Sequence, residues 1–108
     1  MSNHISTIRL NGELTIYQVG EVHEQLQSAL QQVLTAPTSD QPPKLTIDTL
    51  ELTEVDSAGL QLLVQVSQQA LSIDIAIDWQ TPGAALSRMI ELYSAARWFE
   101  SNTEAQPS

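Results

Sequence analysis

The amino-acid sequence predicts an α/β fold with a mixed, mostly parallel β-sheet, an N-terminal hairpin and about three flanking α-helices. In some stretches apolar and polar residues alternate, and in others apolar residues recur every three or four positions; these are the periods of strands and helices. The two kinds of stretch follow each other in the order β-β-α-β-α-β-α, and a short strand is predicted after them. Such alternation within 108 residues indicates a single domain whose helices lie against a sheet.

The predicted hairpin comes from two short stretches rich in β-branched residues, Ile5 to Leu10 and Glu13 to Tyr17. Asn11-Gly12 stands between them. This dipeptide is typical of two-residue hairpin turns, because both residues tolerate positive φ angles. We therefore expect a strand, a tight turn and a second strand.

An amphipathic helix is expected next, because apolar residues then recur at helical spacing with glutamate and glutamine between them: Val22, Leu26, Ala29, Leu30 and Val33. Thr35 to Pro43 contains three prolines and cannot continue this helix, so it is predicted to be a surface loop. Lys44 to Leu50 is predicted to be the next strand, with Leu45 and Ile47 on one face.

A second helix is predicted to run from the segment around Ser57 to about Leu71. Ser72 to Trp79 then alternates as a strand does, with Ile73, Ile75 and Ile77 on one face. Thr81 and Pro82 fit the N-cap and first position of a third helix. The apolar stripe of that helix is Ala85, Leu86, Met89, Ile90 and Tyr93.

The end of the chain completes the expected domain, which spans residues 1–108 with its core at about residues 5–99. Arg97 to Phe99 are assigned to the short last strand. Residues 100–108 form a polar tail without a packing pattern.

Composition restricts the function. Hydrophobic residues make up 42% of the chain and aromatic residues 5%, so the interior is expected to consist of aliphatic side chains. No cysteine is present, which excludes disulfides, thiolate metal sites and cysteine nucleophiles. The net charge is −9, which disfavours binding to nucleic acid or anionic lipid and favours partners with basic contact surfaces.

The cellular location is expected to be the cytoplasm. No apolar run is long enough to cross a bilayer, and the N-terminal residues lack the basic and apolar regions of a signal peptide. We therefore expect no membrane insertion.

The segment Val55-Asp56-Ser57-Ala58-Gly59-Leu60 opens the second predicted helix and is the candidate functional site. Asp56 or Ser57 could cap the helix by accepting hydrogen bonds from its first amides. Ser57 could alternatively be an acceptor of reversible phosphorylation. A role as a catalytic nucleophile is disfavoured, because the flanking glycines and the histidine base of a serine hydrolase are missing.

A helical wheel divides this helix into three sectors. One sector faces the sheet: Gly59, Leu62, Leu63, Val66 and Ala70. A second sector is solvated: Gln61, Gln65, Gln68 and Gln69. The third sector contains Leu60, Val64 and Leu71 close to Ser57, and an apolar strip beside a serine is typical of a docking surface.

No catalytic, cofactor or metal site is expected elsewhere in the chain. Asp48, Asp74 and Asp78 fall on different elements, and His23 is a boundary position on its helix. The sequence also lacks the glycine-rich loop with which many proteins bind nucleotide phosphates.

Two segments resemble the STAS domain, the family of bacterial anti-sigma factor antagonists. One comprises Leu45-Thr46-Ile47-Asp48 and, after a short turn, Val55 to Leu63. The other is the opening Asn11 to Ile16, which is followed by the first helix. The resemblance covers about residues 5 to 99 and implies a mixed sheet with helices on one main face.

What this resemblance implies is a non-enzymatic switch in signal transduction and transcription regulation. In such antagonists the serine after the aspartate, here Ser57, is phosphorylated by a partner that is both anti-sigma factor and kinase, and phosphorylation ends the association. The expected partner-binding residues are Asp56, Ser57, Ala58, Gly59, Leu60, Gln61 and Val64.

Other members of the family have different roles. Some are constitutive subunits of a phospholipid-trafficking ABC transporter and contact its ATPase with the same helix. Others are partners in chemotaxis or two-component pathways, or tails of anion transporters. The chain departs from the phosphorylated members at Ala58, where many of them carry a second hydroxyl residue.

Overall fold

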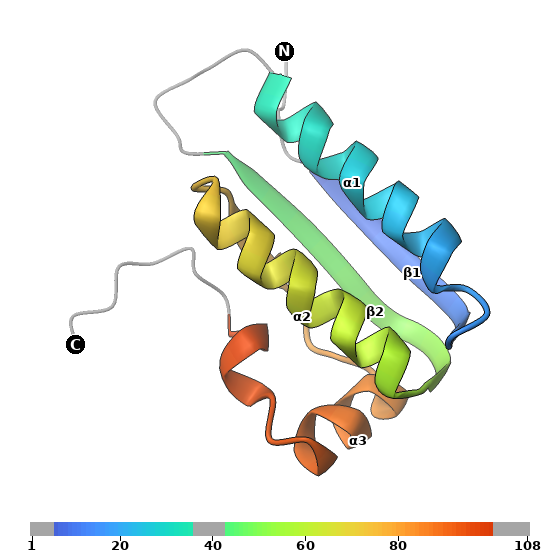
Figure 1. Cartoon of the computed structure of the whole chain (residues 1–108). Coiled ribbons are helices and arrows are strands. Elements are labelled where there is room, and N and C mark those ends of the chain that lie inside the picture. The colour runs from blue at the N-terminus through green and yellow to red at the C-terminus, as the bar shows by residue number, and fades with distance from the viewer. Residues whose placement is uncertain (1–5, 36–42, 101–108) are drawn as a thin grey trace.

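The structure is a computed structural model that describes residues 6–35 and 43–100 (Figure 1). Its elements follow in the order β1 (Ser6–Leu14), α1 (Val19–Thr35), β2 (Lys44–Val55), α2 (Ser57–Ser72), β3 (Ala76–Trp79), α3 (Ala84–Leu92) and a 3₁₀ turn, η1 (Ala96–Phe99). The α/β class and the three helices expected from the sequence are confirmed.

The sheet has the strand order β1-β2-β3, and both neighbouring pairs are parallel. Ile8 lies beside Ile47, and Leu45 lies beside Ile77. The two connections place α1 and α2 on the same face of the sheet (Figure 1). The opposite face carries alternating polar side chains, including the ion pair between Arg9 Nε and Asp48 Oδ2 at 3.3 Å.

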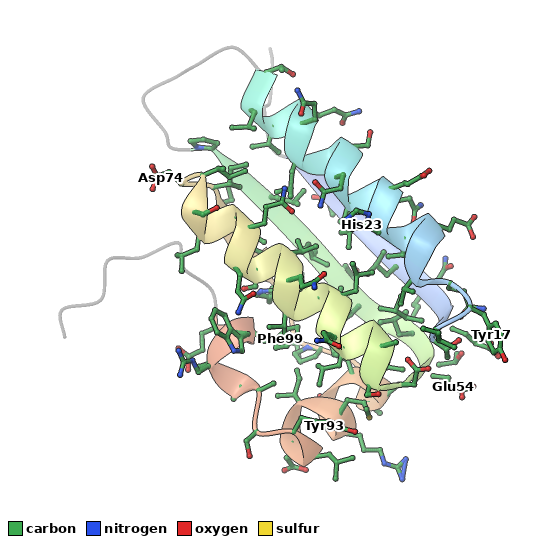
Figure 2. All side chains as sticks on the ribbon, in the orientation of Figure 1. Tyr17, His23, Glu54, Asp74, Tyr93 and Phe99 are labelled. Carbon is green, nitrogen blue, oxygen red and sulfur yellow. The ribbon has the colours of Figure 1, made fainter. Side chains whose placement is uncertain are left out.

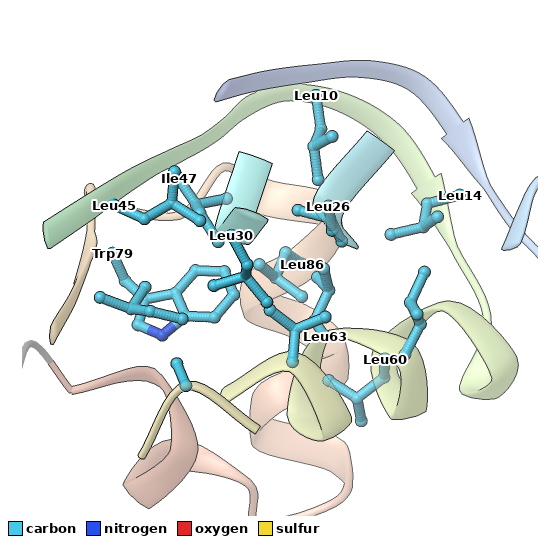
Figure 3. Packing of buried hydrophobic residues seen from close by; sticks show 14 of the residues in the cluster. Leu10, Leu14, Leu26, Leu30, Leu45, Ile47, Leu60, Leu63, Trp79 and Leu86 are labelled. Atoms are coloured by element: carbon cyan, nitrogen blue, oxygen red, sulfur yellow. The ribbon is translucent and has the colours of Figure 1, made fainter. Parts of the chain in front are cut away.

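The core lies between this sheet and its helices (Figure 3). Its most deeply buried side chains come from all three strands and all three helices: Leu14, Leu26, Leu30, Leu45, Ile47, Leu63, Val66, Ile77 and Leu86. The apolar stripes predicted for α1 and for the sheet-facing side of α2 are therefore confirmed, because both point into this cluster.

The predicted N-terminal hairpin is wrong. The segment Ser6–Leu14 is one strand that continues through Asn11-Gly12 and pairs in parallel with β2. Asn11-Gly12 does not form a turn between two strands. The pairing register between β1 and β2 shifts on either side of this dipeptide, and Gly12 has a φ of +77°. Glycine thus permits an irregularity within the strand instead of a chain reversal. The described sheet is accordingly all parallel instead of mixed.

The strand predicted to begin at Ser72 begins at Ala76. Residues 72–75 instead form the last turn of α2 and the bend that follows it. The amide of Ile73 donates to the carbonyl of Gln69, and that of Ile75 donates to the carbonyl of Ala70. Asp74 has a φ of +60° at this helix end. A closing turn of this kind satisfies carbonyls that the helix would otherwise leave unpaired.

The third helix begins later than predicted, with Gly83 as its N-cap in place of Thr81. At Gly83 the chain passes so close to β2 that a Cβ atom would overlap the carbonyl group of Leu50. Thr81 and Pro82 therefore precede the helix instead of opening it.

The strand predicted at Arg97 to Phe99 is the 3₁₀ turn η1 instead. Its backbone curls back onto the domain, where the hydroxyl of Ser67 donates to the carbonyl oxygen of Trp98 at 2.7 Å. The ring of Phe99 lies 4.6 Å from the ring of Trp79, centroid to centroid. These contacts close the end of the core without adding a strand.

Parts of the sequence-based predictions fall outside the described residues: the position Ile5, most of the surface loop up to Pro43, and the polar tail after Glu100. Within the described ranges, no helix combines the length and the apolar character needed to cross a bilayer.

Candidate functional site

The candidate site lies where α2 begins, at the carboxyl end of the sheet. Because β1 and β2 are parallel, their last residues, Leu14 and Val55, are neighbours. The loop that follows β1 therefore lies beside the first turn of α2. In open α/β sheets this edge is where binding sites commonly form, because loops and helix starts converge there.

Asp56 is the residue that joins these two segments. It is the N-cap of α2, and its Oδ1 accepts a hydrogen bond from the amide of Gly59 at 2.9 Å. Its Oδ2 accepts a hydrogen bond from the amide of Ile16 at 3.0 Å. Its own amide donates to the carbonyl of Leu14 at 3.3 Å. One carboxylate thus holds both the helix start and the loop after β1.

These hydrogen bonds lower the pKa of Asp56 from its ordinary value. The amide of Gly59 contributes most, partial burial opposes it, and the amide of Ile16 adds to the lowering. A carboxylate that accepts backbone amides is stabilised in its charged form. Asp56 is therefore ionised when it caps the helix.

Ser57 is the first residue of α2, and its side chain is exposed. From the sequence either Asp56 or Ser57 could cap this helix, and the structure assigns the cap to Asp56. Within the described residues the Ser57 hydroxyl makes no hydrogen bond. It is consequently accessible to another molecule.

Gly59 and Ala58 allow the helix start to approach the end of β1. Gly59 is buried, and a Cβ atom at this position would overlap the carbonyl oxygen of Leu14. Ala58 is half-buried. The absence of a side chain at Gly59 therefore permits this close approach.

The apolar strip predicted beside Ser57 is wrong at Leu60, which is only 5% exposed and belongs to the core (Figure 3). Val64 is half-buried, whereas Leu71 at the far end of the helix is 58% exposed. The reason is that α3 and η1 pack against this flank of α2. A helical wheel considers α2 alone, so it cannot show that α3 and η1, which come later in the chain, cover this flank.

The exposed face of α2 is an uncharged polar row. Its exposed residues follow Ser57 at helical spacing: Gln61, Gln65 and Gln68. Gln69, also predicted to be solvated, is half-buried and exchanges two side-chain hydrogen bonds with Gln27 of α1, at 2.7 and 2.9 Å. Ser57 therefore stands at the start of a row that carries no charge.

The loop after β1 contains two residues that no sequence pattern marked as part of a site, Ile16 and Tyr17. Both are exposed, and Tyr17 projects from the end of the domain that also carries Glu54 (Figure 2). A sequence signal for this loop exists in Thr15-x-x-Gln18, which is the spacing of a capping box at a helix start. The Gln18 side chain accepts from the amide of Thr15 at 3.0 Å, as in such a box.

The charged side chains near the carboxyl ends of β1 and β2 are acidic. Glu13 and Glu54 lie opposite each other on β1 and β2, and both are exposed. An open groove between the end of β2 and α3 has charged side chains of both signs in its lining, Glu54, Arg88 and Glu91. No cluster of three or more histidine or carboxylate side chains suited to a metal is found in residues 6–35 and 43–100.

The fold and the site define a small parallel α/β domain that presents a serine at the start of a helix at the carboxyl end of its sheet. Residues 1–100 match the family described as "Mlab, STAS domain", and the chain therefore belongs to this STAS family. STAS domains are generally non-enzymatic interaction modules. Comparison with curated proteins finds no match.

Proposed function

We propose that this protein is a regulatory interaction module that binds a serine kinase of the anti-sigma type, and that phosphorylation of Ser57 ends this association. The observation that carries the proposal is the exposed Ser57 hydroxyl, which takes no part in capping α2. Its neighbour Asp56 supplies the cap, so Ser57 can be modified without removing the hydrogen bonds that hold the helix start.

The contact surface centres on the turn from Asp56 to Leu60. Ser57 and Gln61 are exposed and face the partner directly, with the half-buried Ala58 and Val64 at their sides. Gly59 and Leu60 are buried, so they support the turn from beneath. Partner binding therefore depends on Leu60 through the position of the helix and not through direct contact.

In the proposed modification the partner supplies ATP and a general base. The Oγ atom of Ser57 attacks the γ-phosphorus of ATP, and the new Oγ–P bond forms as the bond to the β,γ-bridging oxygen breaks. ADP leaves, and the proton of the hydroxyl passes to the base of the kinase.

The phosphate ends binding through its charge. It adds a charge of about −2 beside the carboxylates of Asp56 and Glu54, which repel it. Covering this group with the partner would also require removing its hydration shell, and the Gly59 amide that could compensate already donates to Asp56. The modified surface is thus stable in water but costly to bury.

The test compares the affinity of the purified kinase for Ser57→Ala and Ser57→Asp by isothermal titration calorimetry. We expect Ser57→Asp to bind at least tenfold more weakly, because it places a negative charge at the contact. Gln68→Asp adds the same charge three turns further along α2 and serves as the control, with an affinity near that of the wild type. Equal affinities of Ser57→Ala and Ser57→Asp would contradict the switch.

A second candidate function is that of a constitutive subunit of a phospholipid-trafficking ABC transporter, a role that some STAS proteins have. Two observations favour it. Ala58 stands where many phosphorylated members have a second hydroxyl, and the family matched is described as "Mlab, STAS domain". This function predicts a stable complex with the transporter ATPase in which Ser57 is unmodified, as intact-mass measurement of the purified complex would show.

A further inference from the structure

The loop between β1 and α1 exposes two large apolar side chains, and its backbone is hydrogen-bonded to the N-cap of α2. Tyr17 is 89% exposed, more than any other large hydrophobic side chain in the described residues, and Ile16 is 59% exposed. The amide of Ile16 donates to the carboxylate of Asp56, the residue that precedes Ser57. An apolar pair beside a binding turn is a typical feature of a protein-contact surface.

The exposure of these side chains is not a consequence of a loose loop. The carbonyl of Thr15 accepts from the amides of Gln18 and Val19 at 2.9 and 3.0 Å. The Thr15 hydroxyl donates to the Gln18 side chain at 2.7 Å and accepts from the amide of Tyr17 at 3.3 Å. With the bond from Ile16 to Asp56, the backbone is fixed while both side chains point to solvent. Such pre-organisation reduces the entropy lost on binding.

The charges near the loop indicate what kind of surface covers it. Glu13 and Glu54 are opposite each other on neighbouring strands, a placement that is unfavourable unless a positive group comes between them. Glu21 in the first turn of α1 adds a third exposed carboxylate. The sequence has no lysine or arginine from Leu10 to Pro43 or from Leu45 to Ser87. This charge repels an anionic membrane and suits a basic protein surface.

We propose that Tyr17, with Ile16, is the anchor of the partner surface, and that the partner offers an apolar pocket for the Tyr17 ring with basic side chains at its rim. The inference rests on the proposed function, and its occupant is the same serine kinase. The basic rim faces Glu13 and Glu54, while uncharged groups cover Ser57. A phosphate on Ser57 would then be buried without a positive partner. This explains how the acidic surface of this protein can bind the basic rim of the kinase, and why a further negative charge at Ser57 still ends the association.

Tyrosine suits this role, because its ring buries a large area with few rotatable bonds and its hydroxyl can stay hydrated at the rim. Asp56 is a positioning residue for it, because its Oδ2 holds the backbone of Ile16. Contact at Tyr17 and contact at Ser57 are thereby fixed relative to each other.

The experiment measures binding of the purified serine kinase to immobilised full-length protein by surface plasmon resonance, at low and high salt. Tyr17→Ala is compared with Tyr17→Phe and with Tyr93→Ala, which removes a 54% exposed tyrosine at the end of α3. We expect at least a tenfold loss of affinity for Tyr17→Ala and less than a threefold change for the other two. Glu13→Gln is expected to slow association at low salt only. Circular dichroism confirms that each variant is folded.

The outcomes separate this inference from the phospho-switch. If Tyr17→Ala binds as the wild type does while Ser57→Asp still binds weakly, the anchor is refuted and the switch stands. If Tyr17→Ala is weakened and Ser57→Asp binds like Ser57→Ala, the anchor stands and the switch fails. If the protein binds the transporter ATPase through Tyr17 and does not bind the kinase, the assignment of the kinase to this surface is wrong. The assignment is also wrong if the protein sediments as a homodimer and the Tyr17→Ala variant sediments as a monomer.

Discussion

At the level of single residues, Asp56 decides the geometry of the site. Its two oxygens accept from Gly59 and from Ile16, which lie 43 positions apart in the chain. The sequence allowed the cap at α2 to be predicted, because an aspartate and a serine before an apolar run are typical of a helix start. It could not indicate the second hydrogen bond, because the partner of Oδ2 comes from a distant loop.

The pH dependence of stability tests this role of Asp56. The folded-state pKa of Asp56 is depressed, so its contribution to stability is present above its unfolded pKa of about 3.9 and is lost as the pH falls through the folded value. Asp56→Asn has one carbonyl oxygen for two amides, and we expect it to be less stable than the wild type by about 1–2 kcal/mol at neutral pH. Urea unfolding should show this difference shrink in acid. A difference independent of pH would contradict the assignment.

A second test concerns the close approach at Gly59. A methyl group there overlaps the carbonyl oxygen of Leu14, so we expect Gly59→Ala to reduce the free energy of unfolding by about 1–3 kcal/mol. Gly20→Ala is the matched control, because a Cβ at this position in the first turn of α1 meets nothing within 4 Å. It should leave stability unchanged or raise it by up to about 1 kcal/mol. Equal stability of the two variants in urea would contradict the contact.

At the level of elements, the long amphipathic helices could be predicted well, and the bounds and pairing of the strands poorly. The stripes of α1 and α2 repeat over many residues, so the helical period is unambiguous. The strand-turn-strand pattern around Asn11-Gly12 was misleading, because β1 finds its partner in β2 across a whole helix. Arg97 to Phe99 has too few residues to show a period, and the contacts of Trp98 and Phe99 with Ser67 and Trp79 curl it into a turn.

The pair Gln27 and Gln69 is predicted to join α1 to α2. Both side chains are half-buried and exchange two hydrogen bonds, so removing either one leaves its partner's amide unsatisfied. A double-mutant cycle with Gln27→Ala and Gln69→Ala should give a coupling energy of about 1 kcal/mol in urea unfolding. Strict additivity would show that the pair contributes nothing specific.

At the level of the whole molecule, the sequence indicated the class of fold and the helix start that carries the candidate site, but not which residues of that helix start are exposed. The segment from Val55 to Leu63 carries a local signal, and it does open a helix at the carboxyl end of a strand. Which of its residues are exposed depends on packing by elements far away in sequence. Leu60 is therefore covered where exposure was predicted. The spacing Thr15-x-x-Gln18 could have indicated a helix start in the loop after β1, but not that Tyr17 is exposed near the start of α2.

The most direct test of the account is whether Ser57 accepts a phosphate. The full-length protein is incubated with the purified kinase and ATP, and intact mass and peptide fragmentation are measured beside Ser57→Ala. The account predicts one phosphate on the wild type, located at Ser57, and none on Ser57→Ala. A phosphate on both proteins, or an unmodified wild type that remains bound to the kinase, would contradict it.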